Sequence, residues 1–245
     1  MSTGAPQIQI PHKMACMCGL GEAAILDDDE RHKHQMWNGF LYPTFVETGT
    51  FCGHGIISAI LMGARDIHSI EINPHNFASA YLRLNLVFNY NALETPEFTV
   101  RTQMKDSICI LELHWAGSLQ CRVTLYCGDT RVVLPEILKT LRHPATFWLD
   151  AHWGPDTGEP RPETDKNTDI FPIYSEIDHI SAHPVKDHII MIDDMNQYKE
   201  LFPGEMDRLK EKLTEINDSY IIREMAKGGA DNDHILIAFP EFWQE

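Results

Sequence analysis

The sequence predicts an α/β protein built on a doubly wound, mostly parallel sheet. Three features carry this prediction: strand-like runs alternate with helical stretches from residue 44 onward, the runs are largely apolar throughout, and glycine or acidic residues follow most of them. Strands that are apolar on both sides belong to parallel sheets with helices packed on both faces. We expect seven strands, and the last two form an antiparallel hairpin because their connection is too short for a crossover.

The individual elements follow from apolar periodicity and from the turn residues between them. Strands are expected at residues 45–47, 67–72, 122–127, 146–150, 188–194, 220–223 and 235–239. Helices are expected at residues 56–62, 74–88, 131–141, 171–182 and 204–217. Pro74 suits the first position of a helix. Residues 91–120 are expected to hold an inserted strand and helix.

Composition limits the partners of the protein. Its 245 residues include 20 basic and 36 acidic side chains, which gives a formal net charge of −16. Because affinity for nucleic acids and anionic membranes rests largely on Lys and Arg, neither is expected as a partner. Residues 1–149 hold 14 acidic and 11 basic side chains, whereas residues 150–245 hold 22 and 9. This skew is either a solvated surface or includes a cation site.

The chain divides into two parts. Residues 1–40 lack sustained periodicity and are expected to form an N-terminal extension or lid, whereas residues 41–245 form the domain. A zinc site could be drawn in the extension, but C-x-C and H-x-H spacings disfavour it. Its ligands would be Cys16, Cys18, His32 and His34. We expect a cytoplasmic protein, because no signal peptide, membrane-spanning run or secreted cysteine framework is visible.

The residues after each strand should carry the chemistry, because ligands of open α/β sheets bind outside the carboxyl ends of the strands. The first strand precedes Gly49-x3-Gly53-x-Gly55, which is either an ordinary tight turn or a backbone cradle for a ligand. This spacing differs from G-x-G-x-x-G, which disfavours a nicotinamide or flavin dinucleotide. Glu71 ends the second strand, 22 positions after Gly49, where a carboxylate suits the hydroxyls of a ribose.

The third strand ends at Gly128 and Asp129. Asp129 could accept from an adenine amino group or cap the following helix. These strand ends describe an adenosine-type ligand, and the sequence here resembles the class I S-adenosylmethionine-dependent methyltransferases, which implies a Rossmann-like methyltransferase fold. Residues 47–53 and 68–72 look like the first two motifs of that family. The implied cofactor-binding residues are Glu47, Thr48, Gly49, Thr50, Phe51, Gly53, Glu71, Ile72, Gly128, Asp129 and Asp150.

A closer resemblance runs through the segments FWLDAHW, PIYSEI and IIMIDD, at residues 147–153, 172–177 and 189–194. They are similar to a bacterial and viral branch related to the metal-dependent O-methyltransferases that act on sugars and polyketide glycosides. The resemblance extends over about residues 43–240. It implies S-adenosylmethionine as the cofactor and a hydroxyl of a sugar or small glycosylated molecule as the methyl acceptor.

The same resemblance implies Mg²⁺ or Mn²⁺ held by Asp150, Asp193 and Asp194, and such oxygen ligands suit these ions. An acid often stands two positions after the first ligand in that branch. This chain has His152 there, which we predict to be the general base, with the Asp150 carboxylate as the fallback. Two alternatives stay open: the paired acids could cap the next segment, and the histidine could belong to the core.

Other side chains have a functional and a structural interpretation. His179 and His183 lie four positions apart on a predicted helix and could bind metal, although an exposed helix end is favoured. Trp148, Trp153 and Tyr174 could line the acceptor pocket, and core packing is favoured for Trp148 because it lies inside a strand.

The sequence therefore predicts an S-adenosylmethionine-dependent O-methyltransferase that is assisted by a divalent metal. The alternatives are an N-methyltransferase or protein methyltransferase, and a catalytically inactive cofactor-binding partner subunit. The expected partner is a small-molecule or glycan acceptor. Whether the chain forms a homo-oligomer stays open.

Overall fold

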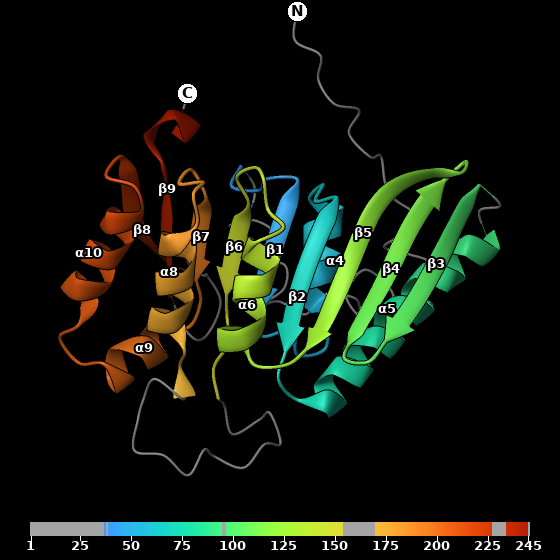
Figure 1. Ribbon diagram of the computed structural model, residues 1–245, viewed down its shortest axis with the longest axis horizontal. Coiled ribbons are helices and arrows are strands. Elements are labelled where there is room, and N and C mark those ends of the chain that lie inside the picture. The colour runs from blue at the N-terminus through green and yellow to red at the C-terminus, as the bar shows by residue number, and fades with distance from the viewer. Residues whose placement is uncertain (1–36, 38, 95–96, 154–169, 227–233, 245) are drawn as a thin grey trace, which may run out of the picture.

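The computed structural model describes residues 37, 39–94, 97–153, 170–226 and 234–244. Its strands are β1 (Thr44–Thr48), β2 (Asp66–Glu71), β3 (Phe98–Lys105), β4 (Ile108–Trp115), β5 (Ser118–Cys127), β6 (Thr146–Leu149), β7 (Ile189–Ile192), β8 (Tyr220–Ala226) and β9 (His234–Pro240). Its helices are α4 (His54–Leu61), α5 (Pro74–Glu94), α6 (Thr130–Leu138), α8 (Ile173–Ala182), α9 (Met195–Leu201) and α10 (Met206–Ile216), followed by a short 3-10 helix, Glu241–Gln244. These strands form one sheet in the order β3-β4-β5-β2-β1-β6-β7-β9-β8 (Figure 1).

The prediction of a doubly wound α/β fold is confirmed. β1, β2, β5, β6 and β7 run parallel to one another. β8 and β9 form the predicted antiparallel hairpin, and β9 also pairs antiparallel with β7. The expected helices are present with shifted ends, and α9 is an addition. No helix in the described part of the chain is long and apolar enough to cross a membrane.

The sheet has nine strands among the described residues, whereas the sequence predicts seven. α5 continues to Glu94, and β3 and β4 then pair antiparallel with each other, while β4 pairs antiparallel with β5. Along β4 the buried residues Cys109, Leu111 and Leu113 alternate with more exposed neighbours, which is the period of a strand with one covered face. The prediction of an inserted strand and helix within residues 91–120 is therefore wrong.

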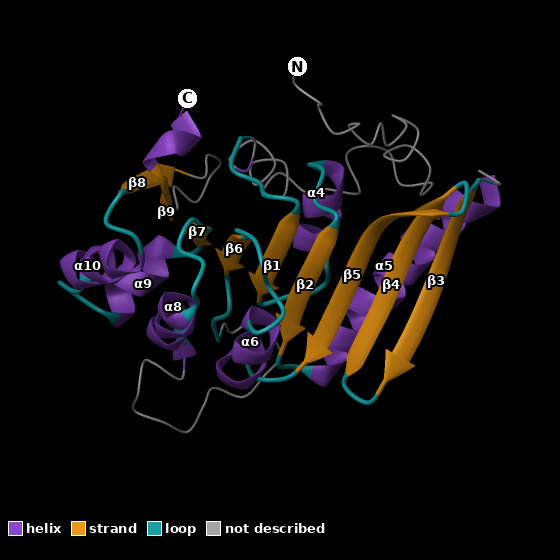
Figure 2. Cartoon of the chain, turned by 45° about the horizontal axis from the view of Figure 1, so that its top comes forward, coloured by secondary structure: helices purple, strands orange, loops and turns teal. Residues whose placement is uncertain are grey.

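Helices cover the two faces of the sheet unequally (Figures 1 and 2). α4 and α5 pack on one face, where Leu84 is fully buried, and α6, α8 and α10 pack on the other, around Ile177. On this second face no described helix covers β3, β4 and β5 (Figure 2). A hollow of about 800 Å³ lies there, beside Asp66 and Arg122. The part covered on both faces is thus the part around β1, β6 and β7.

The predicted N-terminal extension or lid lies largely outside the described residues, and so do the residues of the disfavoured zinc site. Trp37, near the end of that segment, is fully buried. Its ring centroid lies 5.1 Å from that of Phe45 and 5.0 Å from that of Trp148. Trp37 therefore belongs to the core of the domain, although the predicted boundary placed it in the extension.

Candidate active site

The candidate site lies at the carboxyl edge of the sheet, where the winding reverses. β1 pairs with β2 on one side and with β6 on the other. α4, after β1, lies on one face of the sheet, and α8, the next labelled helix after β6, lies on the opposite face (Figure 1). Ligands of open α/β sheets bind at such switch points. The predicted cofactor-binding residues end β1, β2 and β5 or follow them closely, and Asp150 follows β6.

Two glycines after β1, one in the turn and one in the first turn of α4, stand where a side chain would have little room. Gly49 has a φ of 83°, and a Cβ atom there would lie 2.6 Å from the backbone oxygen of Asp150. A Cβ atom on Gly55 would overlap Oε1 of Glu47. The backbone N–H of Asp150 also donates to the backbone oxygen of Thr48 at 3.1 Å. The glycine at position 49 therefore allows the end of β1 to pack directly against the end of β6.

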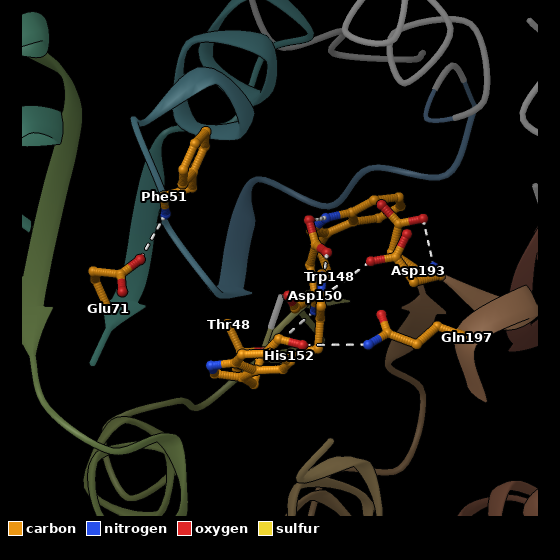
Figure 3. A network of polar contacts seen from close by, with 10 residues as sticks. Thr48, Phe51, Glu71, Trp148, Asp150, His152, Asp193 and Gln197 are labelled. Carbon is orange, nitrogen blue, oxygen red and sulfur yellow. Dashed lines mark hydrogen bonds and ion pairs between the residues drawn. The ribbon is translucent and has the colours of Figure 1, made fainter. Parts of the chain in front are cut away.

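Two glutamates at this edge are buried and have partners in place. Oε2 of Glu47 accepts from the hydroxyl of Ser69 at 2.6 Å. Oε2 of Glu71 accepts from the backbone N–H of Phe51 at 2.7 Å (Figure 3), and its Oε1 accepts from the backbone N–H of Asn73 at 2.9 Å. These bonds fix the Glu71 carboxylate at the end of β2, where the sequence predicts a ribose.

The end of β5 favours the structural interpretation of Asp129. Its carboxylate accepts from the backbone N–H of Arg131 at 2.9 Å, so it caps α6, and the guanidinium of Arg131 lies 2.6 Å away. Hydrogen bonding to Arg131 lowers the pKa of Asp129. Three apolar side chains that follow the ends of β1, β2 and β5, Phe51, Ile72 and Val132, are more than half exposed. Exposed apolar surface at this edge suits the face of an aromatic base.

The ends of β6 and β7 bring three predicted residues together. Asp150, His152 and Asp194 each place one ligand atom within 4.8 Å of the others. Nδ1 of His152 lies 3.1 Å from Oδ2 of Asp194 and 3.7 Å from Oδ1 of Asp150. The indole N–H of Trp148 donates to the other oxygen of Asp150 at 3.1 Å (Figure 3). Each of the three side chains is about one-fifth exposed, so solutes can reach this group, which could hold a metal.

The two neighbouring aspartates differ in environment. Asp193 is buried, and its Oδ1 accepts from the backbone N–H of Asp194 at 2.8 Å. It does not belong to the three-residue group, although the resemblance implied it as a ligand. Asp194 has φ 52° and ψ 44°, a left-handed conformation that is uncommon for residues other than glycine and costs less for aspartate and asparagine than for most others. It stands at the N-cap position of α9, but its side chain makes no capping bond. Such strain is typical of functional sites.

His152 lies in the acidic group and not in the apolar core. Its Nδ1 is also 3.1 Å from the backbone oxygen of Asp150. In a neutral ring, a proton on Nδ1 would serve these oxygen acceptors and leave Nε2 unprotonated, which is the form a general base needs. The same ring could instead ligate a metal. Trp153 follows it and is half-buried, and its backbone oxygen accepts from Gln197 at 3.3 Å (Figure 3).

The sequence prediction assigned no role to Glu176, which lies in the first turn of α8 and is 1% exposed. Its Oε1 has no hydrogen-bond partner among the described residues. Burial raises the pKa of Glu176 to about 7, the nearby hydroxyls of Thr48 and Thr130 lower it, and the charges of Asp129 and Asp150 raise it. The only sequence signal was its place inside the segment PIYSEI. A carboxyl group that is partly protonated at neutral pH therefore lies close to the acidic group.

The remaining candidate side chains are buried or hydrogen-bonded to other parts of the chain. His183 is 6% exposed, and its Nδ1 lies 3.1 Å from Nε2 of His188, so the favoured interpretation as an exposed helix end is wrong. His179 instead lies 3.5 Å from the hydroxyl of Ser175. Trp148 is fully buried, as its position inside a strand predicts. The hydroxyl of Tyr174 bonds to Tyr198 and Glu205, which ties this ring to the helical layer.

Comparison with solved structures identifies the fold. The O-methyltransferase from Bacillus cereus, in complex with S-adenosylhomocysteine, has a TM-score of 0.51 at 13% identity, over 96% of this chain and 94% of that chain. The O-methyltransferase TomG from Streptomyces achromogenes, in complex with S-adenosylmethionine, has a TM-score of 0.50 at 12% identity, over 98% of this chain and 92% of that chain. The chain has a class I methyltransferase fold.

A third solved structure is similar over a smaller share of its own chain. Trm1 from Pyrococcus horikoshii, in complex with S-adenosyl-L-methionine, matches 89% of this chain and 55% of its own, with a TM-score of 0.50 at 11% identity. No protein-family model and no curated protein sequence matches the chain. The fold expected from the sequence motifs is therefore confirmed by structure similarity.

Proposed function

We propose that this protein is an S-adenosylmethionine-dependent O-methyltransferase that uses a divalent cation. The observation that carries the proposal is the pairing of two sites along one sheet edge. The glycine turn and Glu71 end β1 and β2, and the group of Asp150, His152 and Asp194 follows β6 and β7 (Figure 3). Gly49 contacts Asp150, so the two sites are adjacent. A cofactor and an acceptor that exchange a methyl group must lie next to each other.

The β1–β2 end would bind the cofactor. The Glu71 carboxylate, held by two backbone N–H groups, would accept from the ribose hydroxyls. Ile72 and Val132 would contact the adenine ring, because both are exposed apolar residues just past strand ends. Methyl transfer is an in-line displacement at the sulfonium carbon, so the main task of the protein is to align the acceptor oxygen with that carbon.

The donor set at the β6–β7 end fits a divalent cation. Two carboxylates and one imidazole within 4.8 Å suit Mn²⁺ better than Mg²⁺, since Mg²⁺ prefers oxygen ligands alone. When bound, such a cation lowers the pKa of an acceptor hydroxyl and orients it. Asp150 and Asp194 would hold the ion. His152 would complete the ligand set or take the proton of the hydroxyl, with Asp150 as the fallback base.

The acceptor class rests on the sequence resemblance. The segments at residues 147–153 and 189–194 are similar to enzymes acting on sugars and polyketide glycosides, so we propose a hydroxyl of a small glycosylated molecule. The net charge of −16 supports an acceptor that is neither a nucleic acid nor a membrane surface. The cytoplasm remains the expected location.

The proposal is tested by calorimetric titration with S-adenosylhomocysteine and by methyl transfer to a panel of glycosides. We expect binding, and transfer that EDTA abolishes and Mn²⁺ restores. The variant His152→Asn should then show whether His152 is the general base or a metal ligand. Loss of transfer with Mn²⁺ affinity kept identifies the base, and loss of both identifies a ligand. No cofactor binding at high micromolar concentration would contradict the proposal. Binding without transfer to any acceptor would favour the inactive partner subunit.

A further inference from the structure

A cysteine, a histidine and an arginine meet at the turn before α4. Sγ of Cys52 lies 3.4 Å from Nδ1 of His54, and Nη1 of Arg83 lies 3.9 Å from the same sulfur. All three residues are half-buried, so small solutes can reach the thiol. An imidazole can take the thiol proton, and a guanidinium stabilises the thiolate, which is the form of cysteine that reacts.

The other described cysteines have opposite surroundings. Cys109 and Cys121 are buried, and burial raises their pKa values to about 11 and about 12. Burial and the charge of Glu71 raise the pKa of Cys127. Burial therefore disfavours the thiolate at these three positions, whereas Cys52 has an imidazole and a guanidinium beside it.

We propose that Cys52 is a modification site that reacts with peroxides and other soft electrophiles, and that its modification blocks cofactor binding. The second part rests on the proposed function. With hydrogen peroxide, the thiolate sulfur attacks one oxygen and the O–O bond breaks. Two electrons pass from sulfur to the peroxide, and the sulfur becomes a sulfenic acid. The departing hydroxide takes the proton from the His54 imidazolium and leaves as water.

The position of Cys52 explains why its modification would affect the cofactor site. The backbone N–H of the preceding residue, Phe51, donates to Glu71, and the N–H of the following residue, Gly53, donates to the backbone oxygen of Thr50 at 2.9 Å. A Cβ atom on Gly53 would lie in ordinary van der Waals contact with Ala80, at 3.4 Å, so this part of the turn faces α5. An added group on Sγ would therefore displace the turn that holds Glu71.

The first experiment measures reactivity without any cofactor. The full chain is treated with iodoacetamide at pH 7 and the labelled peptides are quantified by mass spectrometry. We expect Cys52 to react at least about tenfold faster than Cys127, and His54→Asn or Arg83→Gln to slow it by a similar factor. His75→Asn, which removes an exposed histidine of α5, is the matched control. Equal rates for Cys52 and Cys127, or no effect of either variant, would overturn the proposal.

The second experiment measures the coupling to cofactor binding. Calorimetry with S-adenosylhomocysteine compares untreated protein, protein alkylated at Cys52, and Cys52→Ser exposed to the same reagent. We expect alkylation to weaken binding at least tenfold, roughly 1.4 kcal/mol, and the serine variant to resist the treatment. Unchanged affinity after alkylation overturns the blocking role. If untreated protein does not bind, the proposed function fails and the blocking role fails with it, while the reactivity measured in the first experiment stands.

Discussion

The two ends of the candidate site handle negative charge in different ways. At the β1–β2 end, Glu47 and Glu71 are almost fully buried, and each accepts hydrogen bonds from hydroxyl or backbone N–H groups of the chain. At the β6–β7 end, Asp150 and Asp194 are more exposed and crowd around a single imidazole, and Asp194 has an unfavourable backbone conformation.

This contrast separates carboxylates that already have hydrogen-bond donors in the chain from carboxylates that still need a compensating cation. Buried carboxylates that are fully hydrogen-bonded stabilise the fold by themselves. Carboxylates that gather without enough compensating positive charge repel each other until a proton or cation intervenes. We therefore expect mutations at the first end to lower stability, and mutations at the second end to raise stability while removing metal binding.

The largest effect is expected at the contact that joins the two ends. Gly49→Ala places a Cβ atom 2.6 Å from the backbone oxygen of Asp150, so one strand end must move. We expect a loss of about 2–5 kcal/mol in the free energy of unfolding, from backbone strain and overpacking together, and no detectable cofactor binding. Urea unfolding and calorimetry measure the two effects.

Gly63→Ala is the matched control for that variant. Gly63 also has a positive φ, 101°, but a Cβ atom there meets nothing within 4 Å. It should therefore show only the cost of the left-handed backbone, about 1–2 kcal/mol, and should bind cofactor normally. Equal losses in the two variants would show that the close approach of β1 and β6 is unimportant.

The second-largest effect is expected at Glu176, beneath the acidic group. Burial raises the pKa of Glu176 from 4.5, the value of a free glutamate side chain, to about 7, so the folded state holds a proton that the unfolded state releases between these values. Its contribution to stability is therefore complete below about pH 4.5 and is lost as the pH rises through 7. The variant Glu176→Gln should not lose stability in this way, because its amide does not titrate.

We therefore expect Glu176→Gln to be more stable than the wild type at pH 8, by roughly 3 kcal/mol, and close to it at pH 4.5. Urea unfolding at both pH values measures the difference. Asp178→Asn, an exposed carboxylate on the same helix, should show no comparable pH dependence. A constant difference between Glu176→Gln and the wild type across this range would contradict the raised pKa.

The contrast also shows which features the sequence predicts. The strands and the residues at their ends follow from apolar runs and turn residues, so the sequence predicts Glu71, Asp150 and Asp194 at one edge. Local patterns do not reveal contacts between distant segments. The packing of Gly49 against Asp150 and the burial of Glu176 under Thr48 and Thr130 depend on how strands and helices meet.

A smaller effect is expected at the first end, from Glu47→Gln. The carboxylate of Glu47 accepts a charge-assisted bond of 2.6 Å from Ser69, and an amide would replace it with a weaker neutral bond. We expect a loss of about 1–2 kcal/mol in the free energy of unfolding, independent of added Mn²⁺. Thermal unfolding with and without the ion measures this, and a gain in stability would contradict the view that this end is complete.

The smallest change in stability is expected from Asp194→Asn. This variant also decides whether the β6–β7 end differs from the β1–β2 end. Asparagine tolerates the left-handed conformation and can still accept a hydrogen bond from His152, and it removes one of two neighbouring negative charges. Without metal we expect the variant to be more stable than the wild type, by about 0.5–1 kcal/mol. With millimolar Mn²⁺ the order should reverse, because only the wild type is stabilised by binding the ion.

Asp218→Asn provides the control for the charge itself, since Asp218 is exposed in the turn before β8 and lies outside the acidic group. It changes the net charge equally, so it should leave both the stability and the response to Mn²⁺ unchanged. If Asp194→Asn lowers stability without metal, the β6–β7 end is completed by its own ion pairs, as the β1–β2 end is by its hydrogen bonds. If Mn²⁺ stabilises Asp194→Asn as much as the wild type, the ion binds elsewhere. The site is balanced by a cation only if Asp194→Asn is the more stable protein without Mn²⁺ and the wild type is the more stable one with it.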